Sequence, residues 1–325
     1  MEEQLTAEKQ ETAEVPDKTG SNYDVADDVA GMKIVFVNVF MIGKQKPGSK
    51  WILVDAGLYG SAGRIRREAE ARFGEFNPPQ AIVLTHGHFD HVGALKALLE
   101  IWGDVPVYTH ALEMPYLTGK SHYPPPDPAI GGGAMSYLSF AYPTKPINLG
   151  DRVHPIPHDG FIPELPDWRM IHTPGHAPGH VSLFRERDKV LIAGDAFVTT
   201  NQNSAYAVMT QKRELHGPPA YFTCDWKAAK KSVKNLAKLK PLAVGTGHGV
   251  SIRGKVLRDE LQYLADAFEE QSIPSKGRYV KRAARTDENG IVDMPAPISF
   301  HVARVLTVGL LVGAGWYVWM KNRRK

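Results

Sequence analysis

The sequence predicts an α/β fold in which two β-sheets pack face to face between outer helices, an αββα four-layer sandwich. Two observations predict these layers. Short β-rich segments cluster along the chain, and helical segments with one apolar face flank the clusters. The two halves of the chain also repeat one order, in which strands and a helix are followed by a strand that ends in histidine. Elements that are apolar on one face bury it against another layer, so this order favours sheets stacked between helices.

The first half of the chain predicts the order β-β-α-β. Residues 1–28 are rich in Glu and Asp and poor in apolar residues, so we expect a disordered acidic tail. The β-rich run 34–42 and the strand 51–54 are separated by a Pro-Gly turn, which predicts a hairpin. A helix is expected over 62–73, and the apolar strand 81–84 leads into a histidine-rich loop.

Beyond that loop we expect a helix over 92–102, a strand over 105–109 and a helical turn over 111–117. Residues 118–146 are irregular and rich in Pro, Gly and aromatic residues. A long stretch of this kind inside a domain is usually functional or mobile. Two interpretations stand side by side, a lid that walls a substrate pocket and a simple surface insertion.

The second half contains several short strands and two amphipathic helices. Strands are expected at 147–149, 152–156, 169–172, 181–184, 190–193 and 242–245. Asp225 is a predicted N-cap for a helix over 226–239. A second helix over 255–271 places Leu257, Leu261, Leu264 and Phe268 on one face.

The composition is that of an ordinary globular protein and excludes few functions. Of 325 residues 43% are hydrophobic and 23% charged, which is enough for one large domain or two small ones. The net charge of +4 is only mildly basic, so no nucleic-acid partner is expected. Cys224 is the only cysteine, which excludes an intrachain disulfide and fits a reducing compartment. The N-terminal residues have no apolar stretch that predicts a secretory signal.

Four metal-competent side chains gather in the sequence THGHFDH at 85–91, directly after an apolar strand. In an extended loop His86, His88 and Asp90 point to one side, and the start of the next helix turns His91 toward them. Neutral imidazole and carboxylate ligands suit Zn, Fe or Mn. Taken alone, the segment is also compatible with a polar loop that happens to be rich in histidine.

Three later positions each place a potential ligand just past a strand. They are His176 in HTPGHAPGH at 172–180, Asp195 after the strand 190–193, and His248 after the strand 242–245. A strand end is where a rigid sheet holds a side chain over a cleft. Taken singly, each residue also has an ordinary explanation: His176 as an imidazole that caps a turn, Asp195 as a turn residue, and His248 as a histidine whose hydrogen bonds are satisfied within the fold. Together they predict a metal centre.

The four motifs THGHFDH, TPGHAPGH, GD at 194–195 and GHG at 247–249 resemble those of the metallo-β-lactamase-fold hydrolases. Within that family they are similar to the branch that includes glyoxalase II and the acyl-homoserine lactonases. The resemblance covers residues 33–271 and implies the metallo-β-lactamase fold, with a hydrolase domain over 29–271. It also implies two divalent metal ions, with Zn expected and Fe or Mn as alternatives.

The resemblance further implies which residues hold the ions. One ion is assigned to His86, His88 and His176, the other to Asp90, His91 and His248, and Asp195 bridges the two. Asp55 resembles the family position that braces the histidine loop through hydrogen bonds. His180 is expected near the pocket rim or behind the ligands, and His172 is expected to be structural.

This ligand set predicts hydrolysis without a Ser or Cys nucleophile. Two cations about 3.5–4 Å apart lower the pKa of a shared water to about 7, so a bridging hydroxide is available to attack a carbonyl. The expected substrate is a small-molecule ester, lactone or thioester. Asp90 is the predicted catalytic residue, because it can pass a proton to the leaving group. Cys224 is expected to be structural, and Tyr206, in a segment expected over the site, is a candidate partner for a developing oxyanion.

The sequence is also compatible with three other functions. They are a metal-dependent nuclease or phosphodiesterase, a mononuclear iron enzyme resembling persulfide dioxygenases, and a non-enzymatic membrane scaffold. The modest charge argues against a nuclease. Asp90, His91 and His248 together favour two metals over one. The cysteine ligand of zinc β-lactamases is missing at Gly194-Asp195, so β-lactam hydrolysis is not expected as a main activity.

The C-terminal residues 302–320 are nearly all apolar. About 19 residues at 1.5 Å each just span a hydrocarbon core of roughly 30 Å. We therefore expect a single-pass transmembrane tail anchor over 299–325, a linker over 272–298, membrane localisation and a cytoplasmic catalytic domain. Gly309 and Gly313 form a small-xxx-small pattern that suggests dimerisation. A buried or interfacial helix is the alternative.

Overall fold

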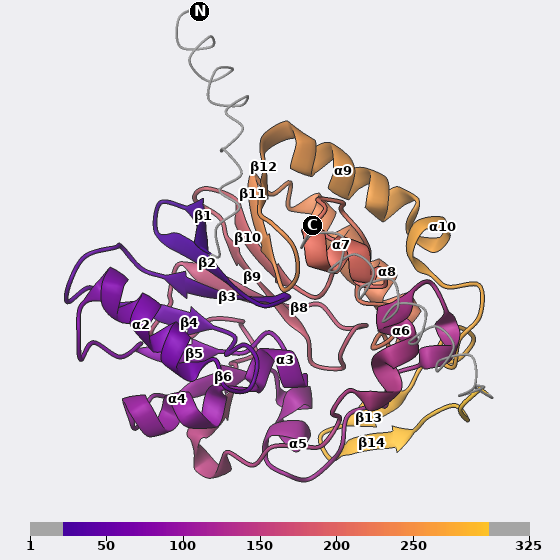
Figure 1. Cartoon of the computed structure of the whole chain (residues 1–325), viewed down its shortest axis with the longest axis horizontal. Coiled ribbons are helices and arrows are strands. Elements are labelled where there is room, and N and C mark those ends of the chain that lie inside the picture. The colour runs from indigo at the N-terminus through magenta and orange to yellow at the C-terminus, as the bar shows by residue number, and fades with distance from the viewer. Residues whose placement is uncertain (1–21, 299–325) are drawn as a thin grey trace, which may run out of the picture.

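The computed structural model describes residues 22–298, and most of its strands form two sheets (Figure 1). The larger sheet has the order β1-β2-β3-β4-β5-β6-β7, with β1 to β4 antiparallel and β4 to β7 parallel. Its strands are β1 (Asn22–Ala26), β2 (Val29–Ile34), β3 (Val37–Ile42), β4 (Ile52–Val54), β5 (Ala81–Val83), β6 (Val107–Thr109) and β7 (Val153–Pro155).

The smaller sheet has the order β12-β11-β10-β9-β8, and only β10 and β11 run parallel. Its strands are β8 (Trp168–His172), β9 (Val181–Arg185), β10 (Val190–Gly194), β11 (Ala243–Thr246) and β12 (Ile252–Arg253). The helices are α2 (Ala62–Phe73), α3 (Phe89–Val92), α4 (Leu95–Trp102), α5 (Met114–Leu117), α6 (Ala134–Leu138), α7 (Ala205–Thr210), α8 (Trp226–Lys238), α9 (Gly254–Asp266) and α10 (Phe268–Ser272).

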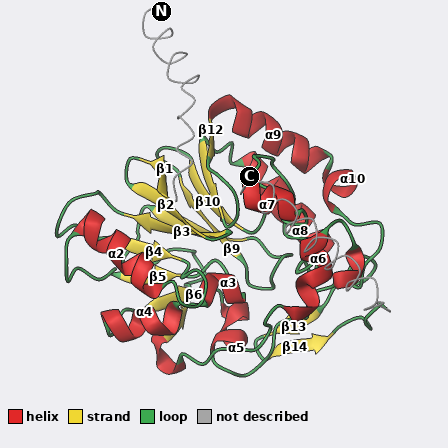
Figure 2. Cartoon of the chain, viewed as in Figure 1, coloured by secondary structure: helices red, strands yellow, loops and turns green. Residues whose placement is uncertain are grey.

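Three apolar cores separate four layers, which confirms the predicted αββα arrangement. Successive side chains of a strand point to opposite faces, so β4 directs Leu53 toward α2 and α4 and directs Ile52 and Val54 into the space between the sheets. On the other side of the molecule, α8 and α9 cover the outer face of the smaller sheet (Figure 2). Asp225 caps α8 as predicted, its carboxylate accepting a hydrogen bond from the amide of Ala228 at 2.9 Å.

Two strand predictions need correction. The run 34–42 is not one strand, because the chain turns at Val35, where φ is +61°, and continues as β3. Both β2 and β3 are largely buried on both faces, so no change in polarity marks the corner between them. The expected strand 147–149 forms only an isolated bridge between Asn148 and Thr118.

The domain is longer at both ends than expected. Residues 22–28, assigned to the acidic tail, form β1 and its turn, and β1 pairs with β2. The expected linker 272–298 carries a hairpin of β13 (Arg285–Asp287) and β14 (Gly290–Asp293). Tyr279 is buried there and its hydroxyl donates to the carbonyl of Pro125 at 2.8 Å. The prolines of this segment exclude a long helix but do not prevent packing.

The expected tail anchor, 299–325, lies outside the described residues. Within 22–298, none of the helices combines the length and the apolar character needed to cross a membrane.

Arg185 on β9 joins the two sheets through an ion-pair network. Its side chain is buried, and its two terminal nitrogens donate to the carboxylate of Asp28, in the β1–β2 turn, at 2.8 and 2.7 Å. The guanidinium carbon also lies 4.7 Å from the centre of the Trp168 ring. A buried guanidinium of this kind depends on its carboxylate partners.

Asp28→Asn is expected to lower the free energy of unfolding by about 2 kcal/mol near neutral pH. Partial burial raises the pKa of Asp28, but the hydrogen bond and charge of Arg185 outweigh it and leave the pKa below 3.8. The ionised carboxylate therefore stabilises the fold above pH 3.8, and this stability is lost as the pH falls through the lowered pKa.

Urea unfolding at several pH values measures the difference in the free energy of unfolding between the wild type and the variant. Asp167→Asn, which alters an exposed partner of Arg187, should change little. If the difference in the free energy of unfolding between the wild type and Asp28→Asn does not become smaller at acidic pH, this account is contradicted.

Candidate metal centre

Seven side chains converge where strands of both sheets end, and each of them is buried. Four lie between β5 and the end of α3, one lies in the loop between β8 and β9, one follows β10 and one follows β11. In that order they are His86, His88, Asp90, His91, His176, Asp195 and His248. Because β10 and β11 are parallel neighbours, their carboxyl ends meet at one edge and bring Asp195 beside His248. The structure thus brings together every residue that the sequence predicted as a ligand.

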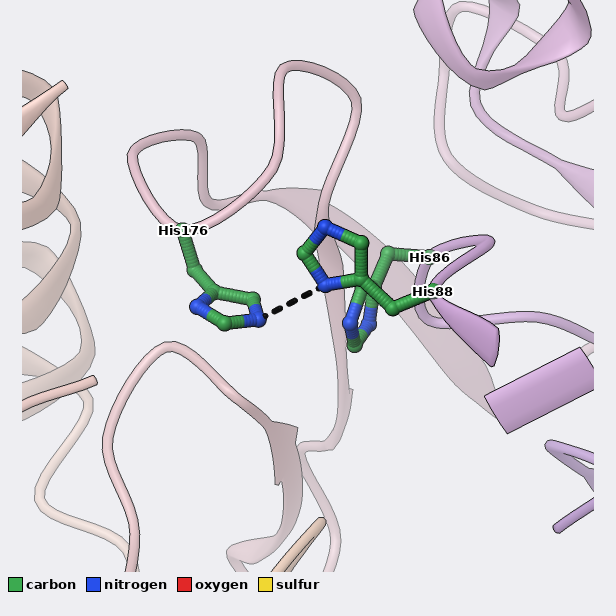
Figure 3. Close-up of side chains that lie close together, drawn as sticks. All are labelled: His86, His88 and His176. Carbon is green, nitrogen blue, oxygen red and sulfur yellow. Dashed lines mark hydrogen bonds between the residues drawn. The ribbon is translucent and has the colours of Figure 1, made fainter. Parts of the chain in front are cut away.

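The first group consists of three imidazoles, His86, His88 and His176. Figure 3 shows His176, from the 173–180 loop, facing the two rings that come from the histidine loop. His88 Nδ1 lies 3.0 Å from His176 Nε2. The ring of Phe222 stacks on His88 at 4.3 Å between centres and backs this group on one side.

The second group consists of Asp90, His91 and His248. One oxygen of Asp195 lies between the two groups. Its Oδ2 is 3.1 Å from His248 Nε2, 3.7 Å from His91 Nε2 and 3.4 Å from His176 Nε2. Asp195 is therefore the single side chain among the seven whose oxygen is shown in contact with nitrogens of both groups.

These residues fit cations. The buried atoms His86 Nε2, His91 Nε2 and Asp195 Oδ1 have no hydrogen-bond partner among residues 22–298, a state that costs about 1–3 kcal/mol for each group. Ligand atoms about 2.0–2.1 Å from a tetrahedral ion lie roughly 3.3 Å apart. The distances between the candidate ligand atoms, 3.0 to 3.7 Å, bracket this value. Cations would satisfy the unpaired atoms.

Hydrogen bonds behind the imidazoles select the nitrogen that faces inward. His91 Nδ1 donates to Asp55 Oδ2 at 2.8 Å, and His248 Nδ1 donates to the carbonyl of Phe36 at 2.8 Å. Each bond fixes the proton on Nδ1 and leaves the Nε2 lone pair free to bind a metal ion. Asp55 also accepts from the amide of Thr85 at 2.8 Å, which confirms that it braces the histidine loop.

The two halves of the centre differ in charge. Burial and the neighbouring imidazoles lower the pKa of His86 and His88 well below the ordinary value, and burial lowers that of His176 to about 4. These rings are neutral near pH 7 and offer lone pairs. Burial also favours the neutral form of His91, but the carboxylates of Asp55, Asp195 and Asp90 raise its pKa well above the ordinary value. A carboxylate-rich half beside a neutral half suits bound cations.

Gly247 is required by the close approach of two segments. A Cβ on this residue would lie 2.0 Å from Asp195 Oδ1 and 2.9 Å from His91 Cε1. Asn38 on β3 holds the same segment from the other sheet, its side-chain amide donating to the carbonyls of Thr246 at 2.9 Å and Gly249 at 2.7 Å. The polar residue inside the apolar run 34–42 is thereby explained, because it positions His248.

Gly247→Ala is expected to displace Asp195 and to remove metal. A misplacement of about 1 Å at a reacting centre lowers activity by about 100-fold. Metal analysis of the purified variant measures the loss directly. Gly63→Ala is the matched control, because a Cβ there meets only the end of the flexible Arg67 side chain, at 3.6 Å. Full metal content in the Gly247 variant would show that the loop adapts.

A sequence model of the metallo-β-lactamase superfamily matches residues 32–248. The chain belongs to this superfamily. It is 47% identical over 249 residues to the probable metallo-hydrolase YflN of Bacillus subtilis (strain 168), which covers 77% of this chain and 94% of that protein. It is 30% identical over 207 residues to the probable metallo-hydrolase YybB of the same organism, covering 64% of this chain and 79% of the relative. The chain is accordingly a metallo-hydrolase.

A solved structure shows the same fold. A beta-lactamase domain protein from Burkholderia ambifaria superposes with a TM-score of 0.53 at 20% identity, covering 80% of this chain and 79% of that one. The architecture predicted from the order of strands and helices is therefore the metallo-β-lactamase fold.

Three residues outside the ligand set of this metallo-hydrolase also had expected roles. His180 is buried behind them, where its Nε2 accepts a hydrogen bond from the amide of Asp195 at 2.8 Å. His172 donates to the carbonyl of Pro178 at 2.9 Å, consistent with a structural role. Cys224 is buried at the start of α8, and burial raises the pKa of its thiol, so it is not a reactive thiolate.

Tyr206, the candidate partner for a developing oxyanion, is 72% exposed on α7, whereas the seven candidate ligands are buried. Tyr142 and Tyr221 are close enough to Asp90 for its charge to raise the pKa of both hydroxyls. Burial and then Tyr142, Asp90 and Asp195 raise the pKa of Tyr221 well above the ordinary value.

The aromatic segment 118–146 forms part of the wall of the site. Tyr142 packs against Phe89 at 5.7 Å, against Phe222 at 6.0 Å and against Tyr221 at 5.5 Å between ring centres. Of the two interpretations of this segment, the contacts favour a wall over a surface insertion. The sequence signal for it was a long irregular stretch rich in Pro, Gly and aromatic residues.

Proposed function

We propose that the chain is a dinuclear metal-dependent hydrolase that cleaves a small-molecule ester, lactone or thioester, as in the branch of glyoxalase II and the acyl-homoserine lactonases. One observation carries the proposal. Asp195 Oδ2 contacts an imidazole nitrogen in each of the two ligand groups, as a ligand shared by two ions must. His86, His88 and His176 would hold one ion, and Asp90, His91 and His248 the other, with zinc proposed and iron or manganese as alternatives. When bound, the ions would supply Lewis acidity and lower the pKa of water, so that carbonyl hydrolysis at neutral pH needs no Ser or Cys nucleophile.

The chain's own residues orient the reaction. Hydrogen bonds from behind hold the imidazoles of His91 and His248, and the rings of Tyr142 and Phe222 exclude water from one side. Asp90 is the most exposed of the seven, at 7%, so its carboxyl is the one best placed to pass a proton to a leaving group.

Metal analysis combined with a substrate panel tests the proposal. The full chain is expected to hold two divalent ions per molecule and to hydrolyse members of a panel of esters, lactones and thioesters, with loss of activity after chelation and recovery with Zn²⁺. A phosphodiester and a persulfide in the same panel cover the nuclease and oxygenase alternatives. A folded, unchelated sample without metal, or a metal-replete sample inactive on every carbonyl substrate, would overturn it.

Attachment to a membrane and dimerisation rest on the sequence of 302–320 alone. We propose that this segment anchors the protein with the catalytic domain in the cytoplasm. Carbonate-resistant association of the full chain with membranes, lost on truncation after Ile298, would support the anchor; extraction of both forms alike would refute it.

A further inference from the structure

A buried glutamate outside the ligand set connects the two loops that carry the three-histidine group. Glu113 ends a 3₁₀ turn (Ala111–Glu113) before α5, and its side chain is 0% exposed. It is absent from the candidate ligand groups found among residues 22–298. A buried carboxyl is unfavourable unless its oxygens are hydrogen-bonded, so its position calls for a physical reason.

Both oxygens of Glu113 are used, and each accepts from a different loop. Oε2 accepts from the amide of Gly87 at 3.0 Å, and Oε1 accepts from the amide of Gly179 at 2.7 Å. Gly87 lies between His86 and His88, and Gly179 lies three residues after His176. One carboxylate thus spans the histidine loop and the 173–180 loop.

Tyr123 completes this arrangement. Its hydroxyl donates to Glu113 Oε2 and lies 2.8 Å from the amide nitrogen of Gly87, while its ring packs on the ring of His88 with 4.7 Å between centres. The hydrogen-bond partners of Glu113 in the described residues are therefore a hydroxyl and two backbone amides. None of them is itself a proposed ligand, but Gly87 lies between two ligands in the sequence and the ring of Tyr123 packs on one of these, His88.

The glycines of the two motifs are explained by the same contacts. A Cβ on Gly179 would lie 2.8 Å from Glu113 Cγ, and a Cβ on Gly87 would lie 2.4 Å from the Tyr123 hydroxyl. Glycine at each position lets the backbone amide reach the carboxylate or the phenol. At their base the loops are joined by one further bond, from the amide of Val181 to the carbonyl of Thr85 at 2.9 Å.

We propose that Glu113 is a positioning residue whose carboxylate holds the 85–91 and 173–180 loops at the spacing that brings His86, His88 and His176 to one ion. The inference rests on the proposed dinuclear function and goes beyond it by assigning control of one of the two sites. In the second group, Asp55 holds His91 and the carbonyl of Phe36 holds His248, and neither contact involves Glu113. We therefore expect a defect at Glu113 to fall mainly on the ion held by His86, His88 and His176.

Glu113→Gln separates this role from general stability. The amide of Gln keeps one acceptor oxygen and turns an NH₂ group toward the other backbone N–H, so one of the two loop contacts is lost. Substitutions behind metal ligands weaken metal binding by about 10–100-fold. We expect one metal equivalent of the full chain to bind about 10–100-fold more weakly and the other to change by less than about threefold.

Chelator competition on metal-free protein measures both affinities, and the absorption spectrum of the Co²⁺-substituted protein reports the ligand geometry of each site. Tyr123→Phe, which keeps the ring against His88 and removes one donor, is expected to give a smaller change in the same equivalent. Glu164→Gln is the matched control, because it makes the same chemical change at a carboxyl that accepts a hydrogen bond from Tyr108 and lies in neither loop. Circular dichroism of each variant checks folding without metal.

If Glu113→Gln binds two metal ions with the same affinities as the wild type, the inference is overturned and the proposed function stays intact. A parallel loss of both equivalents would assign Glu113 a general structural role and overturn it as well. Should Glu113→Gln fail to fold, Glu113→Asp, which is too short to reach both amides, and Tyr123→Phe decide by the same criteria. A wild-type chain that binds no metal would instead refute the proposed function itself.

Discussion

Asp195→Asn is expected to lose at least one of the two metal ions and to lower kcat/KM by more than about 100-fold. Loss of a residue that only orients a ligand lowers metal affinity or activity by about 10–100-fold, and loss of a shared ligand should have a larger effect. The substitution keeps the shape of the side chain but removes its charge. Asp195 Oδ2 lies within 3.1 to 3.7 Å of three imidazole nitrogens from both groups, so a neutral amide there weakens both sites. In free energy, 100-fold corresponds to about 2.7 kcal/mol of lost transition-state stabilisation.

Metal stoichiometry and steady-state kinetics on the most active substrate of the panel measure this effect. Asp225→Asn is the matched control, because it makes the same chemical change at the N-cap of α8, where asparagine caps as well as aspartate. Wild-type metal content with unchanged kcat/KM in Asp195→Asn would mean that this residue is no shared ligand.

Asp55→Ala is expected to weaken metal binding by about 10–100-fold and to lower the free energy of unfolding by about 3–5 kcal/mol. Its carboxylate accepts from the amide and hydroxyl of Thr85 and from His91 Nδ1, each at 2.8 Å. Alanine leaves the buried Thr85 amide and His91 Nδ1 without this acceptor, so the proton of the His91 ring is no longer held on Nδ1. Asp55 also has φ of +61°, a conformation that alanine adopts less readily than aspartate or asparagine.

Asp55→Asn distinguishes the two consequences. Asparagine tolerates the positive φ and keeps one acceptor, so we expect a stability loss of only about 1–2 kcal/mol. Its NH₂ group cannot accept from His91, so the loss in metal affinity should remain near that of alanine. Urea unfolding and chelator competition on both variants test this. An alanine variant that is unstable yet binds metal normally would restrict Asp55 to a structural role.

The ligands were predictable because their signals are local. A histidine-rich loop after an apolar strand, a Pro/Gly-rich turn with His176, and Asp195 and His248 just past two strands can each be read within a few residues of sequence. Helix α8 was likewise marked by Asp225 and by its apolar periodicity. The layered fold followed from the order of such segments, and the apolar cores on both faces of each sheet confirm it.

The packing around the ligands was not predictable, because it depends on contacts between residues far apart in the chain. Glu113 looks like any glutamate beside a helix, and only its distances to Gly87 and Gly179 give it a role. Asn38 reaches carbonyls more than 200 residues away, and residues 272–298 pack on 118–146 although their prolines suggested a linker. The sequence by itself determined which side chains are able to bind metal and which strand ends carry them, since periodicity and turn chemistry act over a few residues. Only the tertiary structure decided which buried polar groups hold those ends together, because a hydrogen bond between distant segments leaves no periodic trace in either of them.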